Sequence, residues 1–163
     1  MGDQRRADRG RRRGRRLSLW DWATRAYAAP GAEAACLRLQ DHYGQSVSYL
    51  LWAAWAAAEV RGIDADLAVR AAAHAVQWEE QVLRPLRAVR RDAALDLRAE
   101  RLAQELVAER RLMEQLEQMT PPSTETKVAV TDALVLAVAH WPTPAPRETL
   151  QSLSRIFADL CSC

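Results

Sequence analysis

Residues that favour β-structure are scarce in this 163-residue chain, which has one phenylalanine, two isoleucines and eleven valines. Alanine and leucine are abundant instead, with 31 and 20 copies. Because unbranched side chains lose little rotamer freedom in a helix, this balance favours helices over strands. Apolar residues make up 49% of the chain and charged residues 27%, which is enough for a buried core and excludes a wholly disordered protein.

Cysteines are also few, and Cys36, Cys161 and Cys163 cannot form a disulfide framework, which favours a reducing compartment. The four residues 17–20 separate the arginine-rich start from Asp21 and are too short for the apolar core of a secretion signal. The longest stretch without a charged side chain, 42–58, includes polar residues and is shorter than the roughly 20 apolar residues that span a bilayer. We expect a soluble, cytoplasmic protein without a membrane span.

Glycine-rich phosphate loops and histidine clusters are missing as well. The six glycines form no G-x-x-x-x-G-K-[ST], G-x-G-x-x-G or G-x-S-x-G motif. His42, His74 and His140 fall on different expected helices, without a second ligand at the spacing of a helical zinc site. We therefore assign no catalytic residue, no metal and no cofactor, and we expect a protein that is not an enzyme.

Positive charge is concentrated at the start of the chain. Residues 1–16 hold eight arginines and two aspartates, whereas the rest has 15 basic and 19 acidic residues. This segment has no apolar periodicity and repels itself, so we expect it to be disordered on its own. It is either an arm that binds nucleic acid or anionic lipid, or a solvated extension.

Helical periodicity over residues 17–91 predicts a core domain of four helices. The third of them, residues 47–61, is apolar nearly all round and should be the central helix. In the fourth, Pro85 lacks a backbone N–H, so this helix should kink near Leu83 or stop and restart. The capping and stop residues that bound these helices are Ser18, Pro30, Gly31, Gly44, Ser46, and Asp64 or Asp66.

The core is followed by a long amphipathic helix over residues 92–119, continuous with the end of the fourth helix. Its narrow apolar stripe should lie along one neighbour or pair with a second copy. After it, 120–163 should form a linker and two C-terminal helices packed on the core. The stripe contains Leu95, Leu102, Leu106, Met113 and Leu116.

Two further groups are candidate sites. Four arginines beside Pro85 could hold an anion or an acidic partner, or could form internal ion pairs with Glu79, Glu80 or the acidic residues from Asp92 onward. A pocket for a small molecule could lie between the tryptophan-bearing helices. The arginines are Arg84, Arg87, Arg90 and Arg91, and the pocket residues are His74, Trp78 and Trp55.

The stretch from Leu17 to about Arg91 also carries a resemblance. It resembles a proteobacterial family of all-helical proteins, known only as a domain of unknown function, of roughly this length. This resemblance implies the helical fold but no activity, cofactor or site residue. The residues that carry it are Leu19-Trp20-Asp21, Tyr27, Pro30-Gly31, Cys36-Leu37-Arg38-Leu39-Gln40-Asp41, Gly44, Val47, Leu50-Leu51-Trp52, Trp55, Trp78, Pro85-Leu86-Arg87 and Arg90-Arg91.

The sequence thus predicts an all-α protein, a compact helical bundle with a long appended amphipathic helix and two C-terminal helices. We expect a non-enzymatic interaction module that binds a protein partner or itself through the stripe, because apolar residues on one face of a long helix need cover. One alternative is nucleic-acid binding through residues 1–16 and the face formed by Arg84, Arg87 and Arg91. The other is a small-molecule or enzymatic pocket around His74 and Trp78.

Overall fold

A computed structural model describes residues 16–122 and 126–160, and within these ranges the fold is all-α, as predicted. The predicted N-terminal arginine segment, except Arg16, lies outside the described residues, and so do Cys161 and Cys163. None of the described helices combines the length and hydropathy needed to cross a membrane.

Side-chain caps fix where three of the first four helices begin, each at a residue predicted for that role. Ser18 Oγ accepts a hydrogen bond from the Asp21 N–H at 3.1 Å, and Asp64 Oδ1 accepts one from the Leu67 N–H at 2.8 Å. Ser46 caps the third helix in the same way. These four helices are α2 (Leu19–Tyr27), α3 (Ala32–Tyr43), α4 (Val47–Ala58) and α5 (Ala65–Trp78).

Two glycines bound α3. Gly31 precedes the helix with a φ of +82°, and Gly44 follows it with a φ of +59°, a left-handed conformation that costs glycine little. The Gly44 N–H donates to Gln40 O at 2.8 Å and so satisfies one of the last carbonyls of α3. These two turns direct α2, α3 and α4 back against one another.

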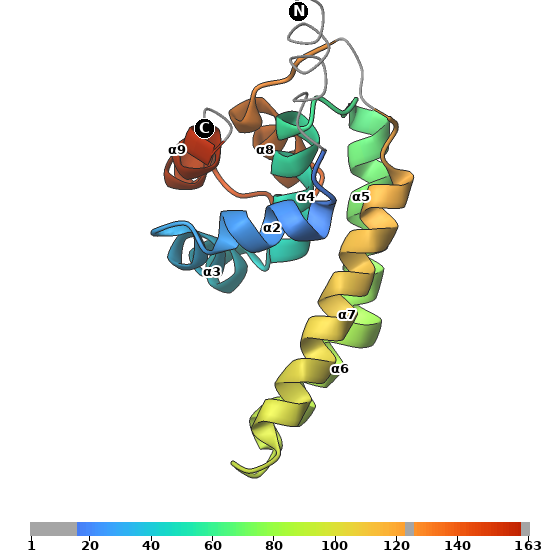
Figure 1. Ribbon diagram of the computed structural model, residues 1–163, viewed down its shortest axis with the longest axis vertical. Helices are drawn as coiled ribbons and strands as arrows, with labels where there is room; N and C mark the ends of the chain where they lie inside the picture. Colours follow the sequence, from blue (N-terminus) through green and yellow to red (C-terminus); the bar gives the residue numbers. More distant parts are fainter. Residues whose placement is uncertain (1–15, 123–125, 161–163) are drawn as a thin grey trace, which may run out of the picture.

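The body of the molecule is built around α4, as predicted. Every residue from Ser48 to Ala57 is buried. Alongside α4 lies α8 (Val130–Ala139), and the hydroxyl of Tyr49 links the two, 3.2 Å from Ala137 O. The 3-10 turn η2 (Arg147–Leu150) and α9 (Gln151–Leu160) complete this part. We call α2, α3, α4, α8, η2 and α9 the body (Figure 1).

A π-helical turn interrupts the α-helix where Pro85 was expected to disturb it. After α5, the chain forms η1 (Glu79–Leu83) and then α6 (Arg84–Asp92). The Arg84 N–H donates to Glu79 O, five residues earlier. This wider turn accommodates Pro85, which lacks an N–H, and lets α6 follow α5 without a break in the helix. The predicted kink therefore takes the form of a π-bulge.

The chain then reverses over residues 93–97, and α7 (Arg98–Met119) runs back along α6, η1 and α5. The prediction of one continuous helix through residues 92–119 was therefore wrong at its start. Ala93 is extended, with a ψ of 146°, although nothing in this alanine- and leucine-rich segment signals a break. Helix propensity is a weak preference that tertiary contacts override, and here the contacts of α6 with α7 favour reversal.

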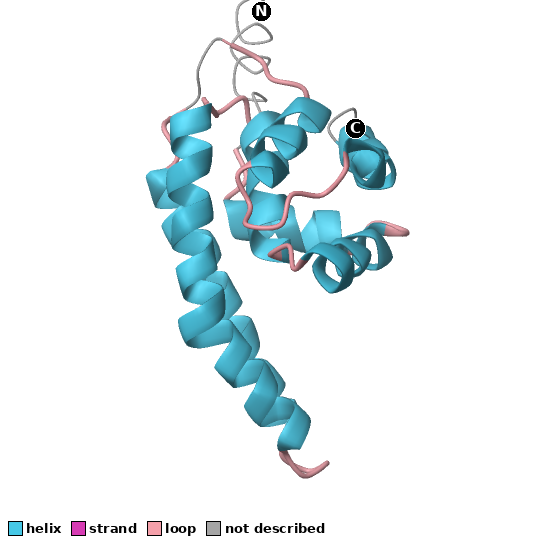
Figure 2. Cartoon of the chain, turned by 180° about the vertical axis from the view of Figure 1, so that it is seen from behind, coloured by secondary structure: helices cyan, strands magenta, loops and turns pink. Residues whose placement is uncertain are grey.

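Residues 84–107, formed by α6, the reversal and the first part of α7, extend beyond the body as a two-helix rod (Figures 1 and 2). We call them the projecting hairpin. No residue of α6 is buried, whereas the second half of α7 contributes Leu112, Met113 and Leu116 to the main core. One end of the long helix is thus part of the core and the other stands outside it.

Candidate functional site: the groove beside the projecting hairpin

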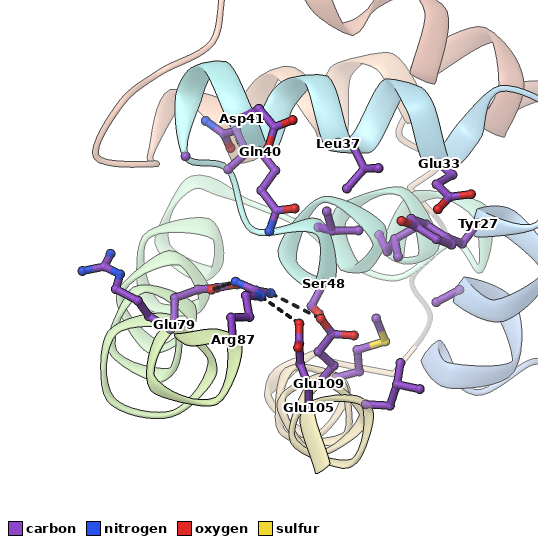
Figure 3. Close-up of a pocket in the computed structure, with 18 of the residues that line it drawn as sticks. Tyr27, Glu33, Leu37, Gln40, Asp41, Ser48, Glu79, Arg87, Glu105 and Glu109 are labelled. Carbon is purple, nitrogen blue, oxygen red and sulfur yellow. Dashed lines mark hydrogen bonds and ion pairs between the residues drawn. The ribbon is translucent and has the colours of Figure 1, made fainter. Parts of the chain in front are cut away.

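Ion pairs hold the two helices of the projecting hairpin together. Arg87 lies at their centre, where Nη1 contacts Glu79 at 2.7 Å, Nε contacts Glu105 at 3.0 Å and Nη2 contacts Glu109 at 3.3 Å (Figure 3). Arg90 adds a second contact to Glu105 at 2.6 Å. Three glutamates and two arginines therefore form one cluster, which we call the clasp.

The clasp carries more negative than positive charge. Burial opposes the charge of Arg87, but the surrounding carboxylates outweigh that effect and raise the pKa of its guanidinium. Burial also raises the pKa of the Glu109 carboxyl. Arg87 lowers this pKa in part, whereas the like charges of Glu105 and Glu79 raise it further. The charged form of Glu109 is thus less favourable in the clasp than that of a free glutamate.

The four candidate arginines have different roles. Arg87 and Arg90 are taken up by the clasp, as the ion-pair interpretation of the sequence expected. Arg84 and Arg91 are exposed. The structure therefore does not present Arg84, Arg87 and Arg91 as one open face for an anion, because the central guanidinium already contacts three carboxylates.

A groove of about 1070 Å³ separates the projecting hairpin from the body. One wall comes from α2 and α3, including Tyr27, Leu37 and Gln40, and the other from α6 and α7 with the clasp. Leu37 and Gln40 point from α3 toward the clasp, and Ser48 of α4 lies between the walls (Figure 3). The groove thus joins elements that are distant in sequence.

The predicted pocket is not this groove, and His74, Trp78 and Trp55 do not line it. Their polar atoms make structural contacts instead. His74 Nε2 lies 2.8 Å from Gln115 Oε1, and the Trp78 indole donates to Ala108 O at 3.1 Å, so both join α5 to α7. The Trp55 indole is fully buried and donates to Leu17 O at 3.0 Å. A pocket around His74, Trp78 and Trp55 stays a prediction, which the contacts among the described residues do not support.

The predicted stripe is divided between core and surface. Met113 and Leu116 are buried against the body, and of the two only Met113, 6% exposed, still lines the groove. Leu102 and Leu106 line the groove and remain 45% and 46% exposed. Leu95 lies in the reversal rather than on a helix and is 81% exposed. The physical reason for this division is the reversal at 93–97, which places only the second half of α7 against the body.

Several groove residues were not predicted as site residues, notably Tyr27, Leu37, Glu105 and Glu109. The available signal was the pair of acids four residues apart on α7, which places two carboxylates on one helix face opposite the arginines of α6. Tyr27 and Leu37 carried no comparable signal, because their position depends on how α2 and α3 pack against α7.

Two candidate nucleophiles on α2 and α3, Tyr27 and Cys36, are held in their protonated forms. Burial, with a smaller contribution from Glu33, raises the pKa of Tyr27 to about 12, so its hydroxyl stays protonated at neutral pH. Burial raises the pKa of Cys36 to about 12, and its inaccessible thiol is unreactive. Among residues 16–122 and 126–160, no three histidine, cysteine or carboxylate side chains are placed to hold a metal ion.

The chain matches a family described as "Protein of unknown function (DUF2390)" over residues 18–116. No curated protein and no solved structure matches it. The family match runs from α2 nearly to the end of α7, beyond the segment 17–91 on which the resemblance was recognised, and so includes both walls of the groove. Because it spans well over half of the sequence, this chain belongs to that family of proteins of unknown function.

Proposed function

We propose that this protein is a non-enzymatic interaction module that binds another polypeptide, from a partner protein or a second copy, in the groove beside the projecting hairpin. The observation that carries this proposal is that both walls expose leucines. Leu102 and Leu106 lie on α7, and Leu37, 38% exposed, faces them from α3. A groove with apolar side chains on both walls and charges around them suits an amphipathic helix.

Burial of these leucines by a bound partner is energetically favourable. Leu102, Leu106 and Leu37 are 45%, 46% and 38% exposed, and full burial of a leucine is worth about 2 kcal/mol. Covering the three would therefore contribute about 3 kcal/mol. Single exposed leucines are ordinary, but several that line one groove are typical of an interaction site.

The two alternatives have less support. Binding of nucleic acid through Arg84, Arg87 and Arg91 conflicts with the ion pairs of Arg87, and residues 1–15 of the arginine segment lie outside the described residues. A small-molecule pocket around His74 and Trp78 conflicts with the contacts that these side chains make across α5 and α7. Neither alternative gains a specific observation in its favour.

Site-specific photocrosslinking in the producing cells tests the proposal. A photoreactive residue at Leu106 should yield a discrete crosslinked species, because this position faces the groove. The matched control is Val69, which is equally exposed, at 50%, but lies on α5 outside the groove. Adding Leu102→Glu should abolish the species. The proposal is wrong if Leu106 gives no species that Val69 does not also give, or if the species survives Leu102→Glu.

A further inference from the structure

We infer that the groove selects a basic segment of a partner protein, one that presents lysine or arginine beside its apolar side chains. This inference rests on the proposed function and adds the chemistry of the partner. It is carried by two observations, the excess of carboxylates along the groove and two buried acceptor oxygens without donors.

The charges around the groove are unequal. Six carboxylates line it, and only four guanidinium groups oppose them. The carboxylates belong to Glu33, Asp41, Glu79, Glu80, Glu105 and Glu109, and the guanidinium groups to Arg84, Arg87, Arg90 and Arg91.

Burial decides which of these charges matter. Arg84, Arg91, Glu33, Asp41 and Glu80 are exposed, so water and salt screen them and each contributes little. The clasp is shielded, and the side chains of Glu105 and Glu79 are only 7% and 14% exposed. The shielded part of the groove therefore keeps one negative charge more than its arginines neutralise, and it attracts a cation.

Two buried oxygen atoms of residues that line the groove lack a donor among the described residues. They are Glu79 Oε1 and Gln45 Oε1, both shielded from solvent. The side-chain nitrogen of Gln45, a residue only 1% exposed, donates to Thr143 O at 2.9 Å, which leaves its oxygen as an acceptor. A buried acceptor without a partner is costly. If the side chain of Glu79 or Gln45 turns toward the groove, an ammonium or guanidinium group there would supply the missing donor, whereas an acidic side chain would supply only further acceptors.

Selection of peptides from a random 16-residue display library on the full-length protein tests this inference. Bound peptides should be enriched in lysine and arginine beside leucine-type residues, and Leu102→Glu should abolish their binding. Glu109→Gln should weaken binding about tenfold, the usual scale of a hydrogen-bonded charge. The matched control is Glu114→Gln, since Glu114 lies on the same helix but is exposed, paired with Arg110 and outside the groove.

The outcomes separate the two proposals. Selected peptides that are neutral or acidic, yet need Leu102, overturn the basic partner and leave the polypeptide-binding groove standing. Peptides indifferent to Leu102→Glu, or no enrichment at all, overturn both. A synthetic peptide of residues 1–16 that displaces the selected peptides at lower concentration than they displace one another identifies the chain's own segment as the occupant. A dimer in light scattering that Leu102→Glu dissociates identifies a second copy, and either result overturns the partner protein.

Discussion

The body and the projecting hairpin are both helical, but different forces hold them together. In the body, every residue of α4 from Ser48 to Ala57 is buried, and Trp52 and Trp55 are completely enclosed. In the hairpin, no residue of α6 is fully buried, although Leu86 packs partly against the core, and ion pairs from Arg87 and Arg90 to Glu105 and from Arg87 to Glu109 join α6 to α7. Packing by apolar burial is non-directional and removes the apolar side chains of both elements from solvent. Ion pairs instead join two helices through a few directed contacts.

This difference explains why the hairpin leaves apolar side chains uncovered. Because the clasp joins α6 to α7, the leucines of α7 do not all have to face α6. Leu102 and Leu106 consequently point to the groove. A region held by charges can thus keep a hydrophobic face for another molecule.

The largest expected effect is on the body. Trp52→Ala removes a fully buried ring that stacks on Tyr49 at 5.3 Å and donates to Thr120 Oγ1 at 2.8 Å. It should lower the free energy of unfolding by about 4 kcal/mol, measured by urea denaturation. The control Val107→Ala, on a 68% exposed residue of the hairpin, should change it by less than about 0.5 kcal/mol. Similar losses for both variants would remove the distinction between the two regions.

The clasp should show the next largest effect. Arg87→Ala leaves Glu79, Glu105 and Glu109 facing one another and should cost about 2 kcal/mol, less than for a fully buried pair because the Arg87 side chain is 21% exposed. Arg84→Ala, one turn earlier and exposed, should cost no more than about 0.5 kcal/mol. Equal costs in urea denaturation would show that the ion pairs do not hold the hairpin.

A stabilising change is expected at the end of α4. Val60 has a φ of +53°, a left-handed conformation that is costly for a β-branched residue. Val60→Gly should raise the free energy of unfolding by about 1 kcal/mol in urea denaturation. Val60→Ala, which keeps a Cβ, should gain less. A loss of stability in Val60→Gly would mean that the packing of this side chain outweighs the strain of its backbone.

The smallest effect concerns the pH dependence of the clasp. Burial raises the folded-state pKa of Glu109 above the ordinary glutamate value of about 4.3, so the folded chain binds this proton more readily than the unfolded chain. The contribution of Glu109 to stability is therefore greatest below pH 4 and falls as the pH rises through its folded pKa. Glu109→Gln should remove this fall and, at pH 7, match or slightly exceed the wild type in thermal unfolding. A variant with an unchanged pH profile would contradict the direction of this shift.

Much of the body and the start of α5 could be predicted from local signals. Ser18, Ser46 and Asp64 cap helices because their side-chain oxygens reach backbone N–H groups within one turn. Gly44 ends α3 because it adopts the left-handed conformation. Such interactions span three or four residues and are therefore visible in the sequence.

The groove was harder to predict because it depends on contacts between distant elements. The reversal at 93–97 has no glycine or proline, and the ion pairs between α6 and α7 accompany it. His74 and Trp78 were singled out as candidate pocket residues, but the sequence did not indicate that Gln115 and Ala108 would satisfy their polar atoms. The site depends on contacts between residues that are far apart in the sequence, and local sequence patterns do not reveal such contacts.

Native-state hydrogen exchange compares the two regions most directly. The amides of α4 should exchange only through global unfolding, whereas those of α6 should open at lower free energy. Arg87→Ala should lower the protection of α6 further, by more than it lowers that of α4. If α6 is protected as strongly as α4 and both lose protection equally in Arg87→Ala, the hairpin is part of the same core. The proposed reason why the side chains of Leu102 and Leu106 remain uncovered would then have no physical basis.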